Sequence, residues 1–272
     1  MKKKQDHTKR RVCLFGTLVV LLILVAAFSE WIVPYDPYAQ DLGNVLMPPS
    51  AEHWFGTDRY GRDLLSRVLV GAKTSVFSSL TVVVIITIVG TAAGTICGYA
   101  GGRMDDVLMR ISDVFLAFPG IVFAIAVASV LPGGVSSAVI ALSVVSWPKY
   151  ARIARSQVLA IRDVPFFAAA KLSGSNPAQI ILRHVLPNIA GQMIVTAVLD
   201  IGTMMMEIAG LSFLGLGAAP PVAEWGAMMS NGRSMLQSAP WVVAAPGAAI
   251  FLSVMVFNLF GDAVRDVLEP VR

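Results

Sequence analysis

The chain has 272 residues, of which 56% are hydrophobic and only 14% are charged, and its mean hydropathy is +0.72. These values differ strongly from those of water-soluble domains, so the composition excludes a soluble enzyme or a soluble binding module. The net charge of +4 does not indicate nucleic-acid binding, because the basic residues stand beside apolar segments and form no separate basic domain. Cys13 and Cys97 each lie within an apolar stretch, a pattern that predicts neither a disulfide framework nor a thiolate metal site.

Five apolar regions approach or exceed the length that crosses a bilayer, which is about 20 residues at about 1.5 Å per residue. In chain order they are Val12–Ser29, Thr74–Gly102, Val114–Pro148, His184–Gly217 and Ser234–Gly261. The third region holds 35 uncharged residues, too many for one crossing, and Pro132, Gly133 and Gly134 supply a turn near its middle. We therefore expect a helical hairpin there, and an all-α polytopic membrane protein with about six transmembrane helices.

The first apolar region follows a run of basic residues, a pattern that secretory signal peptides share. Its apolar stretch is longer than that of a signal peptide, and no small-residue cleavage site directly follows it. Trp31, Tyr35 and Tyr38 come next and are typical of an aromatic belt at the membrane surface. We interpret the region as the first transmembrane helix.

The Lys and Arg residues indicate the orientation, because basic loops are retained in the cytoplasm. With the N-terminus inside, the cytoplasmic segments hold 16 of the 21 Lys and Arg residues, and the outer segments hold the other five. Both termini are therefore predicted to be cytoplasmic. The chain then divides into a tail with the first helix (1–33), an extracytoplasmic loop (34–73) and a five-helix core (74–272) that includes a cytoplasmic loop (149–188).

The cytoplasmic loop carries the most distinctive local pattern, FFAAAKLSGSNPAQIILRHVLPN, from Phe166 to Asn188. This segment resembles the EAA loop of permease subunits of ATP-binding-cassette (ABC) importers, in which small residues, a glycine and a Leu-Pro pair mark a short helix. The residues that match are Ala169, Ala170, Gly174, Leu186 and Pro187. One position departs from the pattern, because Ala168 stands where the loop's eponymous acidic residue would fall.

The resemblance extends over most of the chain. It includes HWFGTDRYGRDLLSRVLVGAKTS (53–75), GYAGGRMDDVLMRISDVFLAFPG (98–120), LSFLGLG (211–217), EWGAMM (224–229) and FNLFGDAVRDVLEP (257–270). Together these segments resemble the C-type permease of the dipeptide, oligopeptide and nickel importer family. The resemblance implies the ABC type I importer permease fold in a prokaryotic cell (inner) membrane. The segment LDIGTMMMEIAGLSFLGLG (199–217) looks closer to nickel-import permeases, so nickel or a metal chelate is the expected substrate, and dipeptides or oligopeptides are the alternative.

The resemblance also implies a role for the 166–188 segment, which would hold a coupling helix that docks on a partner ATPase. Small residues at 169 and 170 permit a close approach, and Gly174 would end the helix. Phe166 and Phe167 are expected to fill an apolar pocket on the partner, and Lys171 is expected to add a favourable charge. The alternative is an amphipathic helix that lies on the membrane surface and contacts no partner.

Two acids, Asp200 and Glu207, lie within an otherwise apolar predicted span. A charge at the bilayer centre costs about 3 kcal/mol, so both acids are expected to face the bundle interior or a water-filled path. Asp200, Met204 and Glu207 share one helical face. This face could line the substrate pathway, where carboxylates attract a cation or a peptide amino group and the thioether contacts a soft metal. Alternatively, the acids bond to neighbouring helices or to the partner permease and fix the packing.

Gly90, Gly94 and Gly98 recur at every fourth position of the second predicted span. Small residues with this spacing let two helices approach closely in lipid, so we expect a packing seam rather than a pore lining. The charged segment from His53 to Asp63 is expected either to cap the outer face or to contact a binding protein. The three histidines are far apart in the sequence, and no metal site is predicted in the chain.

The sequence lacks the GxxxxGK[ST] loop that binds nucleotide phosphates, so the chain itself is not expected to be an enzyme. The resemblance implies that ATP and Mg²⁺ bind to two cytoplasmic partner subunits and that this chain holds no cofactor. The other implied partners are a homologous second permease and an extracytoplasmic solute-binding protein. An intramembrane hydrolase would need a catalytic constellation that cannot be placed in the sequence. An ion-coupled transporter would be expected to show inverted repeats, and the sequence shows no internal repeat.

Overall fold

The structure is a computed structural model that describes residues 2–162, 164–165, 167, 172 and 174–268, with side chains from Lys9 onward. Within these residues the backbone forms helices and no sheet. The long helices are α1 (Lys2–Ala27), α3 (Leu64–Ala100), α4 (Gly102–Leu116), α5 (Gly120–Val130), α6 (Val135–Arg162), α9 (Leu186–Phe213) and α11 (Trp241–Leu268). The short ones are α2 (Ser29–Ile32), a 3₁₀ turn (Leu42–Asn44), α8 (Pro177–Ile180), a π-helix (Ile181–Val185), α10 (Trp225–Gly232) and a second 3₁₀ turn (Arg233–Met235). The fold is all-α, as the sequence predicts.

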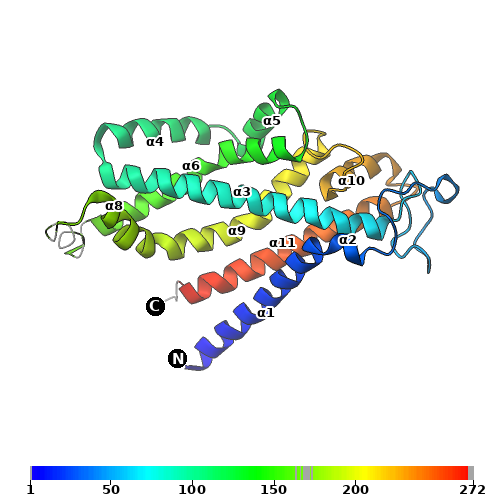
Figure 1. Cartoon of the computed structure of the whole chain (residues 1–272), viewed down its shortest axis with the longest axis horizontal. Coiled ribbons are helices and arrows are strands. Elements are labelled where there is room, and N and C mark those ends of the chain that lie inside the picture. Colours follow the sequence, from blue (N-terminus) through cyan, green and yellow to red (C-terminus); the bar gives the residue numbers. More distant parts are fainter. Residues whose placement is uncertain (1, 163, 166, 168–171, 173, 269–272) are drawn as a thin grey trace.

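The helices form an elongated bundle with different loops at its two ends. Figure 1 shows α3 running along the bundle beside α6 and α9, with α1 and α11 packed together next to them. The start of α1 and the end of α11 lie at the same end of the bundle as α8. The loop between α2 and α3 lies at the opposite end, together with α10. This grouping agrees with the predicted division into inner and outer segments, and the orientation of the bundle in the membrane stays a prediction.

Four helical stretches of the described chain are long and apolar enough to cross a membrane. They are Lys9–Ala27, Leu64–Ala100, Pro177–Phe213 and Trp241–Leu268. The pair α4 and α5, bent by 92° relative to each other, is a fifth candidate. Helix α6 has 28 residues, enough to cross at about 1.5 Å per residue, but its second half carries cations and it is not among the apolar stretches. The count of six transmembrane helices therefore stays a prediction that depends on α6.

The hairpin predicted over residues 114–148 has its turn at the expected place but a different first arm. Gly133 and Gly134 have φ of +89° and +85°, a backbone conformation that favours glycine. The first arm is two helices, because the chain breaks between Leu116 and Gly120. Pro119 causes this break, since it donates no backbone hydrogen bond and disfavours helical geometry in the residue before it.

Two helices extend further than the uncharged stretches predict. Helix α3 starts at Leu64 instead of near Thr74, and α6 continues through Pro148 to Arg162. Residues 149–162 are therefore helical, although the sequence-based interpretation assigned them to the cytoplasmic loop. The physical reason is that charges end an apolar stretch without ending a helix, provided that each charge finds a partner or solvent.

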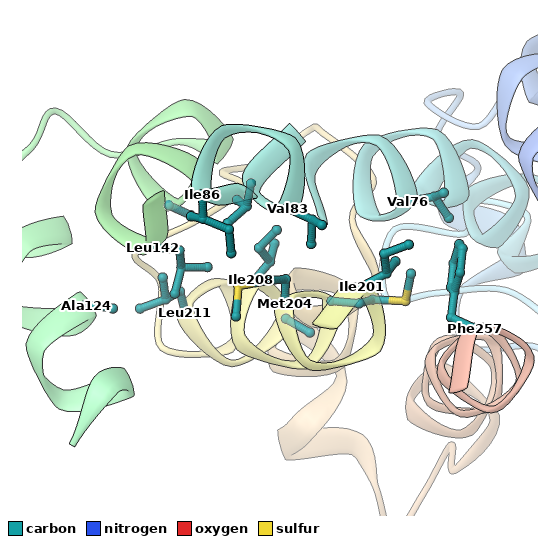
Figure 2. Packing of buried hydrophobic residues seen from close by; sticks show 14 of the residues in the cluster. Val76, Val83, Ile86, Ala124, Leu142, Ile201, Met204, Ile208, Leu211 and Phe257 are labelled. Atoms are coloured by element: carbon teal, nitrogen blue, oxygen red, sulfur yellow. The ribbon is translucent and has the colours of Figure 1, made fainter. Parts of the chain in front are cut away.

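The core lies where α3, α6 and α9 meet. Figure 2 shows Val83 and Ile86 of α3 facing Met204 and Ile208 of α9, with Leu142 of α6 beside them. Each of these side chains is at most 5% exposed. In a membrane, such contacts stabilise the bundle through close packing, because lipid tails are as apolar as the side chains themselves.

Candidate functional site

Helix α9 has one buried side and one open side. The buried residues include Ile201, Met204, Met205, Ile208 and Leu211. The exposed or half-buried residues include Thr203, Met206, Glu207 and Gly210. At about 100° per residue, each set covers an arc of roughly 100–120° on the helix surface. Asp200 lies at the boundary between the two arcs, so α9 brings a buried carboxylate to the edge of an open surface.

The carboxylate of Asp200 is bonded to Lys149 of α6. The ammonium Nζ lies 2.7 Å from Oδ1 and 2.8 Å from Oδ2. The Asp200 side chain is 7% exposed, whereas that of Lys149 is 49% exposed. Asp200 therefore has its counter-charge within the chain, which favours the packing alternative for this residue.

Met204 and Glu207, the other two predicted pathway residues, lie in different environments in the structure. Met204 is 5% exposed and packs in the core beneath α3 (Figure 2). Its sulfur is covered by the core and cannot reach a passing substrate. The prediction that Met204 lines a pathway therefore disagrees with the structure, in which this residue packs inside the chain. Glu207 lies on the open side of α9 and is half-buried.

Two further cations stand on the turns of α6 that follow Lys149, and both pair with acids of α4. Arg155 binds both oxygens of Asp105, with Nε 2.5 Å from Oδ1 and Nη2 2.6 Å from Oδ2. Arg152 forms a close ion pair with Asp113. Through this row of three cations, α6 is tied to α9 on one side and to α4 on the other.

Reasoning from the sequence missed this row because it placed the three cations in a loop. Residues 149, 152 and 155 are three apart, which is the spacing of successive helical turns and was the available signal. Pro148 concealed it, since proline usually marks the end of a helix. Here Pro148 lies inside α6.

An apolar groove of about 340 Å³ opens beside the C-terminal part of α9. It is bounded by α9, α10 and α11, and its lining residues are Met206, Ala209, Gly210, Phe213, Gly226, Met229, Gly247, Ile250, Phe251 and Val254. Met206 and Gly210 belong to both the groove and the open side of α9. The open side therefore runs from this groove past Glu207 to the Lys149–Asp200 pair.

Buried polar contacts hold α10 at the groove. The Glu224 side chain is fully buried and caps α10 by accepting hydrogen bonds from the backbone N–H groups of Gly226 at 3.0 Å and Ala227 at 2.8 Å. The hydroxyl of Ser75 in α3 also donates to this carboxylate, at 3.1 Å. The indole N–H of Trp225 donates to a backbone carbonyl of α3 at 2.9 Å. The EWGAMM segment (224–229), which was identified in the sequence only by its resemblance to the family, thus fastens α10 to α3.

Half of the eight predicted coupling residues lie outside the described part of the chain. These residues are Phe166, Ala169, Ala170 and Lys171. Phe167 is described and is 2% exposed, with its ring centroid 6.0 Å from that of Tyr99 in α3. This ring packs inside the chain and has no free face for a partner, so the expectation that Phe167 fills a pocket on an ATPase is corrected.

The described residues that follow include an exposed leucine and a left-handed glycine. Leu172 is 89% exposed. Gly174 has φ of +79°, and a Cβ added there would meet no atom within 4 Å. Asn176 then caps α8 through reciprocal hydrogen bonds with Gln179, at 2.8 and 3.0 Å. A glycine in this conformation ends a helix or permits a sharp turn.

The Leu-Pro pair of the predicted loop begins a spanning helix. Leu186 is the first residue of α9, and Pro187 lies in its first turn, where the missing N–H of proline costs no helical hydrogen bond. The preceding π-helix joins α8 to α9, so Pro177–Phe213 forms one nearly continuous helical stretch. Movement of α8 would therefore reach α9 without a flexible joint between them.

The three glycines of α3 lie against α6. A Cβ at Gly90 would be 2.6 Å from the backbone oxygen of Trp147, and one at Gly98 would be 2.8 Å from Cβ of Val158. A Cβ at Gly94 would lie 2.8 Å from the backbone carbonyl carbon of Ala151. Contacts this short do not occur, so only glycine lets the two backbones approach as closely as they do.

The segment from His53 to Asp63 folds onto the start of α3. Asp63 caps this helix by accepting hydrogen bonds from the backbone N–H and the hydroxyl of Ser66, at 2.8 and 2.7 Å. Its second oxygen lies 2.9 Å from Nδ1 of His53. Nearby, the buried carboxylate of Asp58 pairs with Arg62 at 2.7 Å and with Arg67 at 3.5 Å. The segment is thus a cap held together within the chain, and contact with a binding protein stays a prediction.

Comparison with known families defines the class of this protein. Residues 90–271, more than half of the chain, match the family described as "Binding-protein-dependent transport system inner membrane component". Residues 9–49 match the "N-terminal TM domain of oligopeptide transport permease C". The chain belongs to this family: it is a multi-pass inner-membrane permease of an ABC importer.

The curated relatives come from import systems with different substrates. The chain is 46% identical over 255 residues to the probable D,D-dipeptide transport system permease protein of Escherichia coli K12, covering 94% of this chain and 86% of the relative. It is 44% identical over 268 residues to the glutathione transport system permease protein of Escherichia coli O6:K15:H31, covering 98% and 88%. It is 40% identical over 253 residues to the nickel transport system permease protein of Escherichia coli K12, covering 93% and 91%. The recognised family and its C-type branch are confirmed, and the substrate is not determined by these similarities.

Proposed function

We propose that the chain forms half of the translocation pore of an ABC importer, paired with a homologous second permease. Two cytoplasmic ATP-binding subunits bind ATP and Mg²⁺, and an extracytoplasmic solute-binding protein delivers the substrate. The catalytic residues for ATP hydrolysis belong to those partners. This chain converts their movement into alternating access of the pore.

The observation that carries this proposal is the open side of α9. An apolar groove and the half-buried carboxylate of Glu207 lie along this helix, and the exposed ammonium of Lys149 in α6 borders it at Asp200. Charged groups within a membrane-length bundle face water or protein rather than lipid. We therefore assign the side of the molecule that carries them to the pore.

The coupling segment supports the same proposal from the inner end. It directly follows α6, which carries the three cations, and it precedes the stretch Pro177–Phe213 that leads into α9. A force on this segment is expected to act on both α6 and α9 because the segment lies between these two helices in the chain. Leu172 and Gly174 are the described residues that we assign to contact with an ATPase, together with the predicted Phe166, Ala169, Ala170 and Lys171.

Substitution of Gly174 tests the coupling assignment. Gly174→Asp and Gly174→Arg are expected to abolish ATP-driven uptake, because a charged side chain would occupy the surface on which the ATPase docks, while the protein still reaches the membrane. Gly133→Asp is a matched control: Gly133 also has positive φ and open space around its Cβ position, but it lies in the turn between α5 and α6. Gly174→Asn separates backbone strain from charge, since Asn tolerates this conformation. Normal uptake by Gly174→Asp would refute the assignment.

The proposed substrate is nickel or a metal chelate, and small peptides are the second candidate. The segment 199–217 favours nickel by its resemblance to nickel-import permeases. The relatives at 46% and 44% identity are named for D,D-dipeptides and glutathione, which favours peptides. Stimulation of ATP hydrolysis in the reconstituted complex by Ni²⁺, a nickel–histidine chelate or a dipeptide, each with the cognate binding protein, decides between them. Stimulation by the dipeptide alone would eliminate nickel.

A further inference from the structure

The ammonium group of Lys149 has bonding capacity that the chain does not use. A lysine has three N–H donors, and the described contacts of Lys149 are the two oxygens of Asp200, at 2.7 and 2.8 Å. Nearly half of the side chain is exposed, while its partner carboxylate is buried. The exposed part of the ammonium can therefore bind one more acceptor without losing its bond to Asp200.

The place of Lys149 in the fold determines what that acceptor can be. Lys149 lies near the middle of the 28-residue helix α6. An exposed ammonium at such a depth is too costly in hydrocarbon, so it faces water or another polar group. It meets α9 at Asp200, the point at which the open side of that helix begins. The free side of the ammonium thus borders the surface that we propose as the pore.

A second charge of opposite sign lies further along the same surface. Glu207 follows Asp200 by seven residues, which corresponds to about 10 Å along the helix axis. The apolar groove begins beside it, at Met206, and continues past it through Gly210 to Phe213. A compound that moves inward from this groove meets a carboxylate first and an ammonium second. The order suits a substrate that carries both an amino group and a carboxylate.

A bare divalent cation fits this arrangement poorly. The buried acid that would attract it, Asp200, is already bonded to Lys149 through both oxygens. The exposed ammonium repels a metal ion and attracts an anion. We propose that Lys149 is a specificity-determining residue whose ammonium group binds a carboxylate of the transported substrate, as found in a peptide or in a metal chelate of an amino acid. This inference rests on the proposed function and narrows its substrate class.

The experiment measures ATP-driven uptake into proteoliposomes that contain this chain with its second permease, ATP-binding subunits and binding protein. The probes are L-alanyl-L-alanine, a nickel–histidine chelate and Ni²⁺ alone. The double variant Lys149→Gln/Asp200→Asn removes both charges and leaves two amides that can bond to each other. It is expected to lower uptake of the transported carboxylate-bearing probe by about tenfold or more, the loss typical of a charged hydrogen bond. Lys149→Arg, which keeps the cation, is expected to retain uptake within about threefold.

A matched control comes from the outer end of the bundle. Lys73 and Glu30 form an ion pair of the same length, 2.7 Å, in which the lysine is exposed to the same extent, 48%. Lys73→Gln/Glu30→Gln is expected to leave uptake unchanged. If Lys149 acted only by joining α6 to α9 through Asp200, the double variant, whose two amides keep that contact, would retain uptake, and the inference would be wrong.

The remaining outcomes separate this inference from the function on which it rests. Full uptake of a carboxylate-bearing probe by the double variant would overturn the role of Lys149. Wild-type uptake of Ni²⁺ alone, with neither carboxylate-bearing probe transported, would also overturn it and would leave the importer function standing. Absence of ATP-driven uptake of all three probes by the wild-type complex would contradict the proposed function, and the inference with it.

Discussion

The chain contains two sets of aspartate–arginine pairs that differ in burial and in sequence separation. In the segment from His53 to Asp63, which we call the outer cap because the sequence predicts that it lies outside, Asp58 pairs with Arg62 four residues later, and both side chains are 8% exposed. In the inner half of the bundle, Arg155 of α6 reaches Asp105 of α4, 50 residues away, and is 32% exposed. The outer pairs join residues that are neighbours in the chain, whereas the inner pairs join separate helices.

This difference indicates which part of the molecule is rigid and in which part the ion pairs can be exchanged. A buried ion pair cannot be broken without leaving a bare charge in a dry environment, which is strongly unfavourable. A half-exposed cation keeps part of its hydration, so exchanging its partner costs far less. The outer cap is therefore built to hold one geometry, whereas the partly exposed cations of α6 can exchange partners at a lower cost.

The largest effect is expected in the outer cap. Asp58→Ala leaves Arg62 and Arg67 buried without their carboxylate and also removes acceptors for the backbone N–H groups of Tyr60 and Arg62. Breaking a buried pair in this way costs about 3–5 kcal/mol. Thermal unfolding of the purified protein in detergent should therefore show a strongly lowered Tm, or too little folded protein to measure.

Asp36→Ala is the matched control for this prediction. Asp36 accepts a hydrogen bond from a backbone N–H two residues later, at 2.8 Å, as Asp58 does, but it is exposed and has no arginine partner among the described contacts. Its loss should lower the Tm only slightly. Equal stability of the two variants would show that the buried network does not hold the cap.

An intermediate effect is expected for the pair between α4 and α6. Arg155→Ala removes a bidentate interaction and leaves Asp105, whose side chain is 10% exposed, without its partner. We expect a loss of about 2 kcal/mol, less than in the outer cap because Arg155 keeps contact with solvent. The reversed pair Asp105→Arg/Arg155→Asp should recover part of the lost stability, and the measurement is again the Tm. A reversed pair no more stable than the single variant would show that packing, not charge, joins the two helices.

The sequence predicted much of the fold because its main signals are local. The long apolar stretches around α1, α3, α9 and α11 identify membrane-length helices, and the glycines at 133 and 134 mark a turn that needs positive φ. The glycines of α3 could be assigned to close packing by their spacing alone. Each of these features is decided by residues within one helix or one turn.

The candidate site was less predictable because it depends on pairs that are distant in the sequence. The charge of Lys149 excluded its segment from the expected spans, and only the contact with Asp200, 51 residues away, shows how the helix accommodates it. Met204 shares a face with Glu207 in a helical projection, yet the core covers one residue and not the other. Phe167 could not be recognised as buried, since its contact with Tyr99 depends on the packing of α3.

The smallest effect is expected at the inner ends of α1 and α11, where Arg11 and Asp266 form an ion pair of 3.3 Å. Both side chains are about half exposed, at 52% and 48%, so solvent screens their attraction and ordering them costs entropy. Asp266→Asn should change the free energy of unfolding by less than about 1 kcal/mol, and the Tm should stay close to that of the wild type. Arg11 and Asp266 are 255 residues apart in the sequence, further than any cation of α6 is from its acidic partner. This variant therefore tests whether burial or sequence distance sets the strength of an ion pair. A loss as large as that of Arg155→Ala would show that long-range pairs stabilise this bundle regardless of exposure, and the cations of α6 would then belong with the rigid outer cap.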